Sequence, residues 1–223
     1  MKKRWILLCA LLVVSVACAV RIAMVNHADW LEAYAANTVI YEEGADVPLP
    51  DENYYFSGYK RLEGYYVRVE KTELIPTESL LVQYGMTLDD LTKLAFPGME
   101  DKVDMSIYEY VYIVTASFWN RDFESNQGYM ISFMDHPVVG PDFLINADLK
   151  GILAIPEFNE ELNGFSFGIK SNRVMTFRIP YLIDTRSEAP ISVDYLLSSS
   201  PKLLIGYYPD EIYAELPVPE FIE

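Results

Sequence analysis

The stretch Tyr65-Tyr66-Val67-Arg68-Val69-Glu70 decides the fold class, because its side chains alternate with a period of two residues. Its apolar side chains (Tyr65, Val67 and Val69) fall on one face and its charged ones on the other, as in a β-strand with one buried face. Further along, Ile107 to Trp119 is a long apolar strand, too continuous to be solvated along one whole face. The sequence therefore predicts a domain built mainly from β-strands.

Further strands follow at short spacing, separated by turn residues such as Ser171-Asn172 and Pro209-Asp210. The expected strands are Tyr129 to Met134, Lys150 to Ile155, Gly164 to Ile169, Arg173 to Ile179, Lys202 to Tyr208 and Glu211 to Val218. In Arg173 to Ile179, the side chains of Met175, Phe177 and Ile179 are expected to face inward. Strands at this spacing predict a sandwich of two antiparallel sheets.

One short helix is expected between the first two main strands. Thr87-Leu88-Asp89-Asp90 has the form of an N-terminal capping box, with an acid at its fourth place. Leu88, Leu91 and Leu94 or Ala95 then form a stripe at helical spacing, and Pro97-Gly98 ends it. The helix lies in an excursion from roughly Pro76 to Met105, and an excursion of this length is more often a lid or a contact surface.

The N-terminus has the layout of a secretory signal or a membrane anchor. Lys2, Lys3 and Arg4 precede an apolar run, and the first 28 residues carry four cations and no anion. Trp5 to Val25 holds one charge, Arg21, and a spanning helix needs about 20 apolar residues. The cations hold that end in the cytoplasm, so the chain is expected at the cell membrane with its main domain extracytoplasmic.

Three fates of this segment are open. It stays as a transmembrane anchor, or a signal peptidase cuts after Ala19 in the small-residue pattern Ala17-Cys18-Ala19, or Ser15 to Cys18 is read as a lipobox and Cys18 is lipidated. The acidic stretch Glu42 to Glu52 holds two prolines and is interpreted as a linker. The expected organisation is a signal peptide or anchor over residues 1–28, a stalk and linker over 29–53, and an extracytoplasmic β-sandwich domain over 54–223.

The exported part is strongly acidic. Beyond the first 28 residues the chain carries 13 cations and 33 anions, a net charge of −20. Such a field repels nucleic acid and anionic lipid, so neither is an expected partner of the domain. Both cysteines, Cys9 and Cys18, lie in the apolar N-terminal segment, so no disulfide can link parts of the domain, and a hydrophobic core must stabilise it.

Four segments occur in an order that is similar to a known family: Gly64 to Leu74, Tyr110 to Asp122, Arg173 to Pro180 and Lys202 to Tyr207. A first strand of the form G-Y-x-V-x-V, a strand ending in Asn and an apolar strand closed by Pro resemble the telokin-like, immunoglobulin-type β-sandwich domains of uncharacterised membrane-anchored proteins and lipoproteins of Gram-positive bacteria. The resemblance covers roughly Tyr59 to Leu216. It implies an immunoglobulin-like fold and a location at the cell surface, and it transfers no catalytic residue. The expected fold is therefore an immunoglobulin-like antiparallel β-sandwich with one short inserted helix, preceded by an N-terminal transmembrane or signal helix. The excursion and the stretch Asp135 to Asn163 depart from its pattern.

Two short catalytic motifs lack the context that their chemistry needs. Gly164-Phe165-Ser166-Phe167-Gly168 matches G-x-S-x-G, but β-like residues follow it, and both histidines, His27 and His136, lie upstream. Ser199-Ser200-Pro201-Lys202 matches S-x-x-K, but Pro201 resists the helix that would place Ser and Lys on one face. We therefore expect no enzymatic activity.

No metal or cofactor is expected. Two histidines and no exported cysteine leave zinc and copper without their ligands. Calcium needs only oxygen ligands, and Asp135, Asp142, Asn146 and Asp148 lie in a loop-rich region where they could converge. They do not match an EF-hand loop, and we interpret them as ordinary solvated loop acids.

The tyrosines are the most prominent residue class. Tyr108, Tyr110 and Tyr112 alternate along one strand and therefore share a face. If that face is exposed, its rings suit the binding of a glycan or a peptide, and if it is covered, they pack in the sandwich.

The leading hypothesis is a non-catalytic cell-surface protein whose β-sandwich binds another envelope component. The contact would be made through the excursion (Leu88, Leu91 and Met99) or through a sheet edge. The alternative is an extracytoplasmic domain that binds a glycan or a peptide through the tyrosine-rich face.

Overall fold

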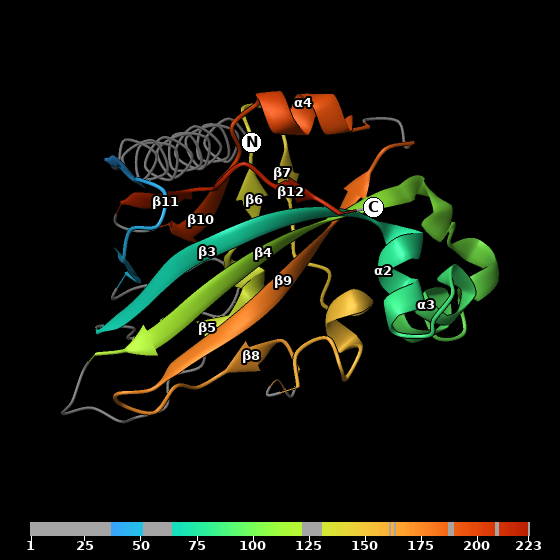
Figure 1. The fold of residues 1–223 in the computed structure, drawn as a ribbon, viewed down its shortest axis with the longest axis horizontal. Helices are drawn as coiled ribbons and strands as arrows, with labels where there is room; N and C mark the ends of the chain where they lie inside the picture. Colours follow the sequence, from blue (N-terminus) through green and yellow to red (C-terminus); the bar gives the residue numbers. More distant parts are fainter. Residues whose placement is uncertain are drawn as a thin grey trace, which may run out of the picture. The chain divides into compact units, whose positions relative to one another are not determined.

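The computed structural model describes residues 37–50, 64–121, 131–160, 162, 164–186, 190–207 and 210–222. The chain divides into two compact units, Met1–Asn37 and Thr38–Glu223, and the described residues other than Asn37 belong to the second. This unit is mainly β, with a few short helices (Figure 1). The predicted fold class is confirmed at that level.

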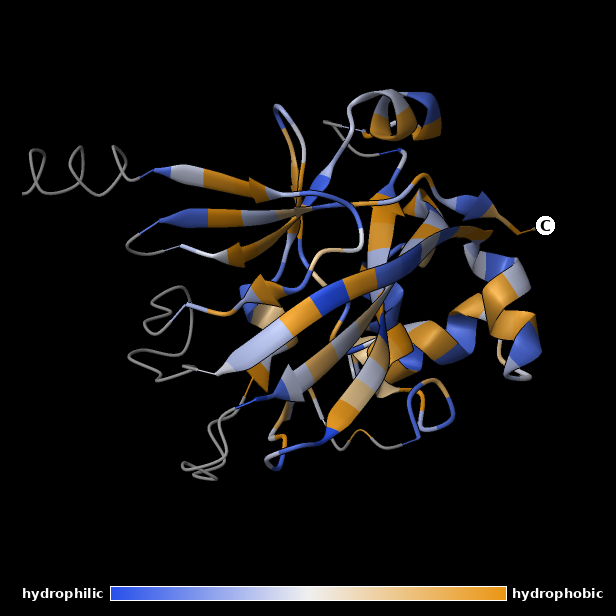
Figure 2. Ribbon diagram, turned by 60° about the vertical axis from the view of Figure 1, so that its left-hand side comes forward, coloured by the Kyte–Doolittle hydropathy of each residue, from blue (hydrophilic) through white to orange (hydrophobic). Residues whose placement is uncertain are grey.

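The central sheet has the strand order β12-β3-β4-β9, with β2 also paired to β3. Its strands are β2 (Val47–Pro48), β3 (Tyr65–Pro76), β4 (Tyr108–Asn120), β9 (Val174–Asp184) and β12 (Glu220–Phe221). The two strands that the alternation and the apolar run predict are therefore neighbours, paired antiparallel along their whole length. Bands of hydrophobic and hydrophilic residues alternate along these strands (Figure 2).

The second sheet has the order β1-β11-β10-β6-β7, and β5 and β8 form a separate pair. These strands are β1 (Thr38–Tyr41), β5 (Ile131–Ser132), β6 (Val138–Val139), β7 (Leu144–Ile145), β8 (Ser166–Phe167), β10 (Lys202–Gly206) and β11 (Glu211–Glu215). The prediction of purely antiparallel sheets is wrong at two places, because β1 runs parallel to β11 and β12 runs parallel to β3. Each is a short strand far in sequence from its partner, and a parallel pair requires such a long connection.

The folded unit begins earlier than predicted. The stretch interpreted as a stalk and linker over 29–53 contains β1 and β2, each paired within a sheet. Val47 and Leu49 are buried in the core, so two apolar side chains outweigh the acidic and proline-rich composition of this stretch. The expected start at residue 54 is therefore wrong.

One hydrophobic core lies between the inner face of the central sheet and the second sheet. Phe118 and Phe177 on the inner face pack against Phe133 and Phe167, with ring centroids 4.4–6.3 Å apart. The hydroxyl of Tyr181 donates to the carbonyl of His136 at 2.7 Å, and the His136 ring lies 3.2 Å from the Leu204 carbonyl of β10. His136 is thus a buried structural residue.

Three α-helices are described where one was expected: α2 (Thr77–Gln83), α3 (Leu88–Ala95) and α4 (Val193–Ser198). The predicted helix is α3, and its capping box between Thr87 and Asp90 is confirmed. Helix α2 follows β3 directly and buries Leu80 and Leu81 fully, although its seven residues are too few to show a helical period. Four 3₁₀ turns complete the helices: η1 (Glu100–Lys102), η2 (Met105–Ile107), η3 (Phe133–Asp135) and η4 (Ile152–Ala154).

Two predicted strands are replaced by such turns. The expected strand Lys150 to Ile155 is η4, because the carboxylate of Asp148 accepts the backbone N–H groups of Gly151 and Ile152 at 3.0 and 2.6 Å. Tyr129 and Met130 of the expected strand Tyr129 to Met134 lie outside the described residues. Of the rest, Ile131–Ser132 is extended and η3 follows, since the Ser132 hydroxyl accepts the N–H of Met134. Local side-chain bonds to the backbone thus override the β-like composition.

Strand β9 forms the edge of the central sheet and continues through Pro180, beyond its predicted end at Ile179. Pro180 has no N–H, which an edge position tolerates. Its carbonyl accepts the N–H of Asp148 at 2.8 Å. Two residues earlier, the side-chain amide of Asn159 bonds both the N–H and the carbonyl of Arg178, at 2.9 and 2.8 Å. The side chain of Asn159 and the backbone of Asp148 therefore bind the hydrogen-bonding groups of this part of the edge.

No helix within the described residues is long and apolar enough to cross a membrane. The segment expected to be an anchor or signal peptide lies outside the described residues, and so does Cys18.

Candidate binding site at the helix end

The excursion between β3 and β4 packs on the outer face of the central sheet, at the end where β3 leads into α2. We call this the helix end, and the opposite end, near Tyr65 and Asn120, the open end (Figure 1). Ile75, Val111 and Ile113 point outward there, yet all are buried. The excursion contributes Leu80, Leu81 and Leu91, each fully buried. Helices α2 and α3 thus cover this half of the face with apolar side chains.

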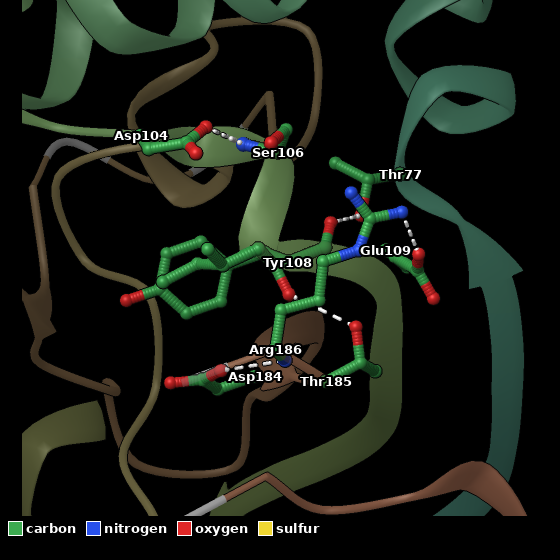
Figure 3. A network of polar contacts seen from close by, with 9 residues as sticks. Thr77, Asp104, Ser106, Tyr108, Glu109, Asp184, Thr185 and Arg186 are labelled. Carbon is green, nitrogen blue, oxygen red and sulfur yellow. Dashed lines mark hydrogen bonds and ion pairs between the residues drawn. The ribbon is translucent and has the colours of Figure 1, made fainter. Parts of the chain in front are cut away.

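A network of polar contacts fastens the excursion to the sheet (Figure 3). At its start, the hydroxyl of Thr77 donates to the carbonyl of Tyr108 at 2.6 Å. At its end, the carboxylate of Asp104 accepts the N–H of Ser106 at 2.9 Å and so caps η2 just before β4 begins. The Ser106 hydroxyl and this backbone N–H lower the pKa of the Asp104 carboxyl, since both favour its ionised form.

The same network ties β4 to the end of β9. Thr185 bonds the carbonyl of Ile107 through its backbone N–H and its hydroxyl, each at 3.0 Å. Arg186 forms an ion pair with Glu109, and its N–H donates to Asp184 (Figure 3). The excursion is therefore held at both of its ends, and the surface between α2 and α3 has a defined shape.

A groove of about 400 Å³ lies between α2 and α3. It is lined by Glu78, Leu81, Val82, Met86, Thr87, Leu88 and Asp89. Its floor is apolar, and Val82 is 72% exposed, which is unusual for a valine on a short helix that otherwise packs on the core. Carboxylates stand at its rim.

Two other carboxylates of the excursion, those of Asp90 and Glu100, have pKa values below their usual range. The hydroxyl and the backbone N–H of Thr87 both donate to the Asp90 carboxylate, and these bonds lower the pKa of Asp90. Glu100 near the end of the excursion has its pKa lowered by the backbone N–H of Gly98. With its apolar lining and acidic neighbours, the groove can accept an apolar side chain that is flanked by cations.

A second hollow of about 390 Å³ lies beside the network, between the excursion and β7. Tyr108, Asp148 and Asp184 contribute its polar groups. Burial raises the pKa of Tyr108, and the charges of Asp184 and Asp148 raise it further. Burial also raises the pKa of Asp148, against the backbone bonds that stabilise its ionised form. Because that carboxylate already caps η4, it serves the loop and not a reaction.

The predicted tyrosine row does not form an exposed face. Tyr112 is fully buried in the core, and burial raises its pKa to about 12. Tyr108 and Tyr110 are half-buried, and a register irregularity separates them. Tyr110 lies against Phe221 of β12, with ring centroids 6.1 Å apart.

The predicted excursion residues are also divided. Leu91 is fully buried under α3 and Leu88 is half-buried in the groove, whereas Met99 is 49% exposed. The groove residues that the sequence did not single out are Glu78, Leu81, Val82 and Met86. Met86 lies beyond Gln83, where α2 ends, so no helical spacing links it to Val82 and no sequence pattern indicates this surface.

The four loop oxygens considered for calcium do not converge. Asp142 accepts a bond from the Tyr195 hydroxyl, Asp148 caps η4, and Asp135 is buried on η3. Asn146 is exposed. Across the described part of the chain, no group of three or more His, Cys, Asp or Glu side chains is placed to hold a metal ion.

The two short motifs lie in β-strands, turns and the end of a helix. Ser166 lies in β8, two residues after Gly164, whose φ of +99° marks a turn. No helix follows it before β9. Ser199 closes α4 and Lys202 begins β10, so no helical face carries both residues.

The described residues form a mainly β domain with a groove between two short helices. Residues 38–212 match the DUF5028 family, a domain of unknown function, and the chain belongs to that family. This match begins at the first residue of β1, in agreement with the corrected start of the folded unit. Neither curated proteins nor solved structures give a match to this chain. The resemblance to telokin-like domains stays a prediction.

Proposed function

We propose that this protein is a non-catalytic surface protein, held at the outside of a cell membrane by its N-terminal segment, that binds another envelope protein through the groove between α2 and α3. The groove is the observation that carries the proposal. It joins an exposed apolar floor to a rigid frame, because Thr77 and Asp104 fix the two ends of the excursion. A surface that needs no reordering on binding loses little conformational entropy.

The chemistry of the groove selects the partner. Val82 and Met86 offer apolar contact, and methionine adapts its shape to an incoming side chain. Glu78 and Asp89 at the rim, with a domain that carries a strong negative charge, attract cations. The proposed partner therefore inserts an apolar side chain that is flanked by lysine or arginine, as an amphipathic basic helix does.

The topology supports a sandwich as the scaffold for this surface. Two sheets share one core, and β3, β4 and β9 run antiparallel through its centre. We propose that this arrangement is immunoglobulin-like, with the parallel strands β1 and β12 added at its margins. The signal-like N-terminus, whether retained, cleaved or lipidated at Cys18, supports a location at the membrane surface.

Affinity purification of the tagged full-length protein from gently solubilised native membranes, followed by mass spectrometry, tests the proposal. Val82→Asp places a charge on the apolar floor, and we expect it to reduce recovery of the partner at least tenfold. The matched control is Val174→Asp, since Val174 is 63% exposed at the open end. The control should leave recovery unchanged.

Equal recovery with both variants, or no stoichiometric partner with the unaltered protein, would contradict the proposal. The same spectra identify the N-terminal peptide. They show whether the residues before Ala19 are retained, whether cleavage has made Val20 the N-terminal residue, or whether Cys18 carries lipid.

A further inference from the structure

The open end of the outer face carries three rows of side chains in register across β3, β4 and β9. The first row is Tyr66, Trp119 and Val174. The second is Arg68, Ser117 and Thr176. The third is Lys71, Thr115 and Arg178. Successive rows along β4 are about 7 Å apart, so the three rows span about 14 Å.

A register irregularity between Val69 and Lys71 makes the third row possible. The pairing skips Glu70, so Lys71 points to the outer face, although strict alternation would turn it inward. The bulge thereby adds a cation to this face and leaves Glu70 exposed.

Aromatic rings and guanidinium groups pack together at the first row. The rings of Tyr66 and Trp119 are stacked, with centroids 6.2 Å apart and planes 13° from parallel. The Arg121 guanidinium lies 4.3 Å from the Tyr66 centroid and 4.8 Å from that of Trp119. Arg68 lies 5.4 Å from Trp119 on the same face. Both rings are only half-buried, and no helix covers them among the described elements.

Two carboxylates pair with the cations of this face, and each of them lies close to two cationic side chains. Asp46 accepts the Arg68 Nε at 2.8 Å and also binds Arg121. Glu73, whose side chain is buried, lies 3.2 Å from Lys71 and 3.6 Å from Arg178. Each group of three therefore keeps one uncompensated positive charge. In a unit whose residues 38–223 carry 13 cations and 31 anions, a net charge of −18, this is a local excess of cations. At physiological ionic strength charges are screened beyond about 8 Å, so a ligand at this face responds chiefly to these groups.

We propose that the open end of the central sheet is a binding site for an acidic oligosaccharide. The apolar face of one sugar ring stacks on Tyr66 and Trp119, as aromatic surfaces bind flat apolar groups. Sugar carboxylates take the two uncompensated charges, since guanidinium groups bind carboxylates through paired hydrogen bonds. Thr176 is exposed between the two charged groups and faces the sugar hydroxyls, and its hydroxyl lies 2.8 Å from that of Ser117, which is itself buried. This site is separate from the groove, and it does not depend on the proposed protein partner.

Isothermal titration calorimetry of the full-length protein in detergent tests the site. The probes are tri-galacturonate, the uncharged trisaccharide maltotriose, and hexaglutamate as an acidic peptide. We expect tri-galacturonate to bind at least tenfold more tightly than either of the others. Trp119→Ala and Arg121→Gln should each weaken its binding at least tenfold. Val174→Asp, which places an anion in the first row, should weaken it as well.

Val82→Asp is the matched control, because it changes the groove and leaves the open end as it is. Arg121→Gln alters an exposed side chain, so it tests the site even if Trp119→Ala fails to fold. The proposal is overturned if tri-galacturonate does not bind, or if Arg121→Gln binds it as the unaltered protein does. Equal binding of hexaglutamate would overturn the assignment to a sugar and indicate an acidic peptide instead.

Discussion

The two ends of the central sheet share the same three strands but use their outer face in opposite ways. At the helix end the outward side chains are Ile75, Val111 and Ile113, and the excursion buries them. At the open end they are aromatic, hydroxyl-bearing and cationic, and helices leave the rings partly exposed. The outward side chains change from apolar to polar near the third row, where the buried carboxylate of Glu73 pairs with Arg178.

This contrast shows that one face of a sheet can serve both stability and recognition. The helix end combines part of the hydrophobic core with a groove, because its helices bury apolar side chains on one face and offer the other face to solvent. At the open end, the outward side chains bury less apolar surface and several of them are charged. We expect mutations at the helix end to change the free energy of unfolding, and mutations at the open end to change binding.

The largest expected effect is at the helix end. Leu91→Ala empties a fully buried position and should lower the free energy of unfolding by about 3 kcal/mol. Leu94→Ala on the same helix is the control, since Leu94 is 40% exposed, and it should cost less than about 1 kcal/mol. Urea unfolding monitored by circular dichroism measures both. Similar losses would mean that α3 is not packed on the sheet as described.

A smaller effect is expected from the network that holds the excursion. Thr77→Val removes the bond to the Tyr108 carbonyl and should cost about 1 kcal/mol. Thr176→Val makes the same change at the open end, where the hydroxyl is exposed, and should stay within about 0.5 kcal/mol. The same urea titration compares them. If Thr176→Val were the more destabilising of the two, the assignment of stability to the helix end would be wrong.

The smallest expected effect concerns Asp46. Partial burial acts to raise its pKa, but the bonds from Arg121 and Arg68 outweigh this, so the pKa lies below its usual value. A lowered pKa stabilises the folded state above the unfolded pKa of about 3.9, and this contribution is lost as the pH falls through the folded value. Asp46→Asn should therefore cost about 0.5 kcal/mol at pH 7. The loss should vanish in strong acid, as unfolding measured between pH 2 and 7 would show. A constant difference across that range would speak against the ion pairs.

The sequence predicts the long strands and α3 well, because their signals are repeated over many residues. Alternation identifies β3, an unbroken apolar run identifies β4, and the Thr87 capping box identifies α3. Short elements escape such reasoning. Helix α2 is too brief for a period, and β1 and β2 lie in a stretch whose composition suggests a linker.

The binding surfaces were harder to predict, because they depend on tertiary contacts. Spacing places Leu91 on the same stripe as Leu88, but only packing shows that Leu91 is buried and that the neighbouring Val82 is exposed. Tyr112, which alternation places in one row with Tyr108 and Tyr110, is likewise buried in the core. The side chains that meet at the open end come from strands far apart in the sequence. The bulge at Glu70 also shifts the alternation of inward and outward side chains by one residue, so Lys71 points to the outer face.

The edge of β9 bears on how copies of this protein behave beside one another. An open sheet edge is a template on which another chain can add a strand, and proteins that are crowded together aggregate through such edges. Here Asn159 completes the hydrogen bonds of Arg178, and Pro180 has no N–H to offer. Copies of this protein at high local density would therefore not pair their sheets through the edge of β9. They would contact one another through their side chains.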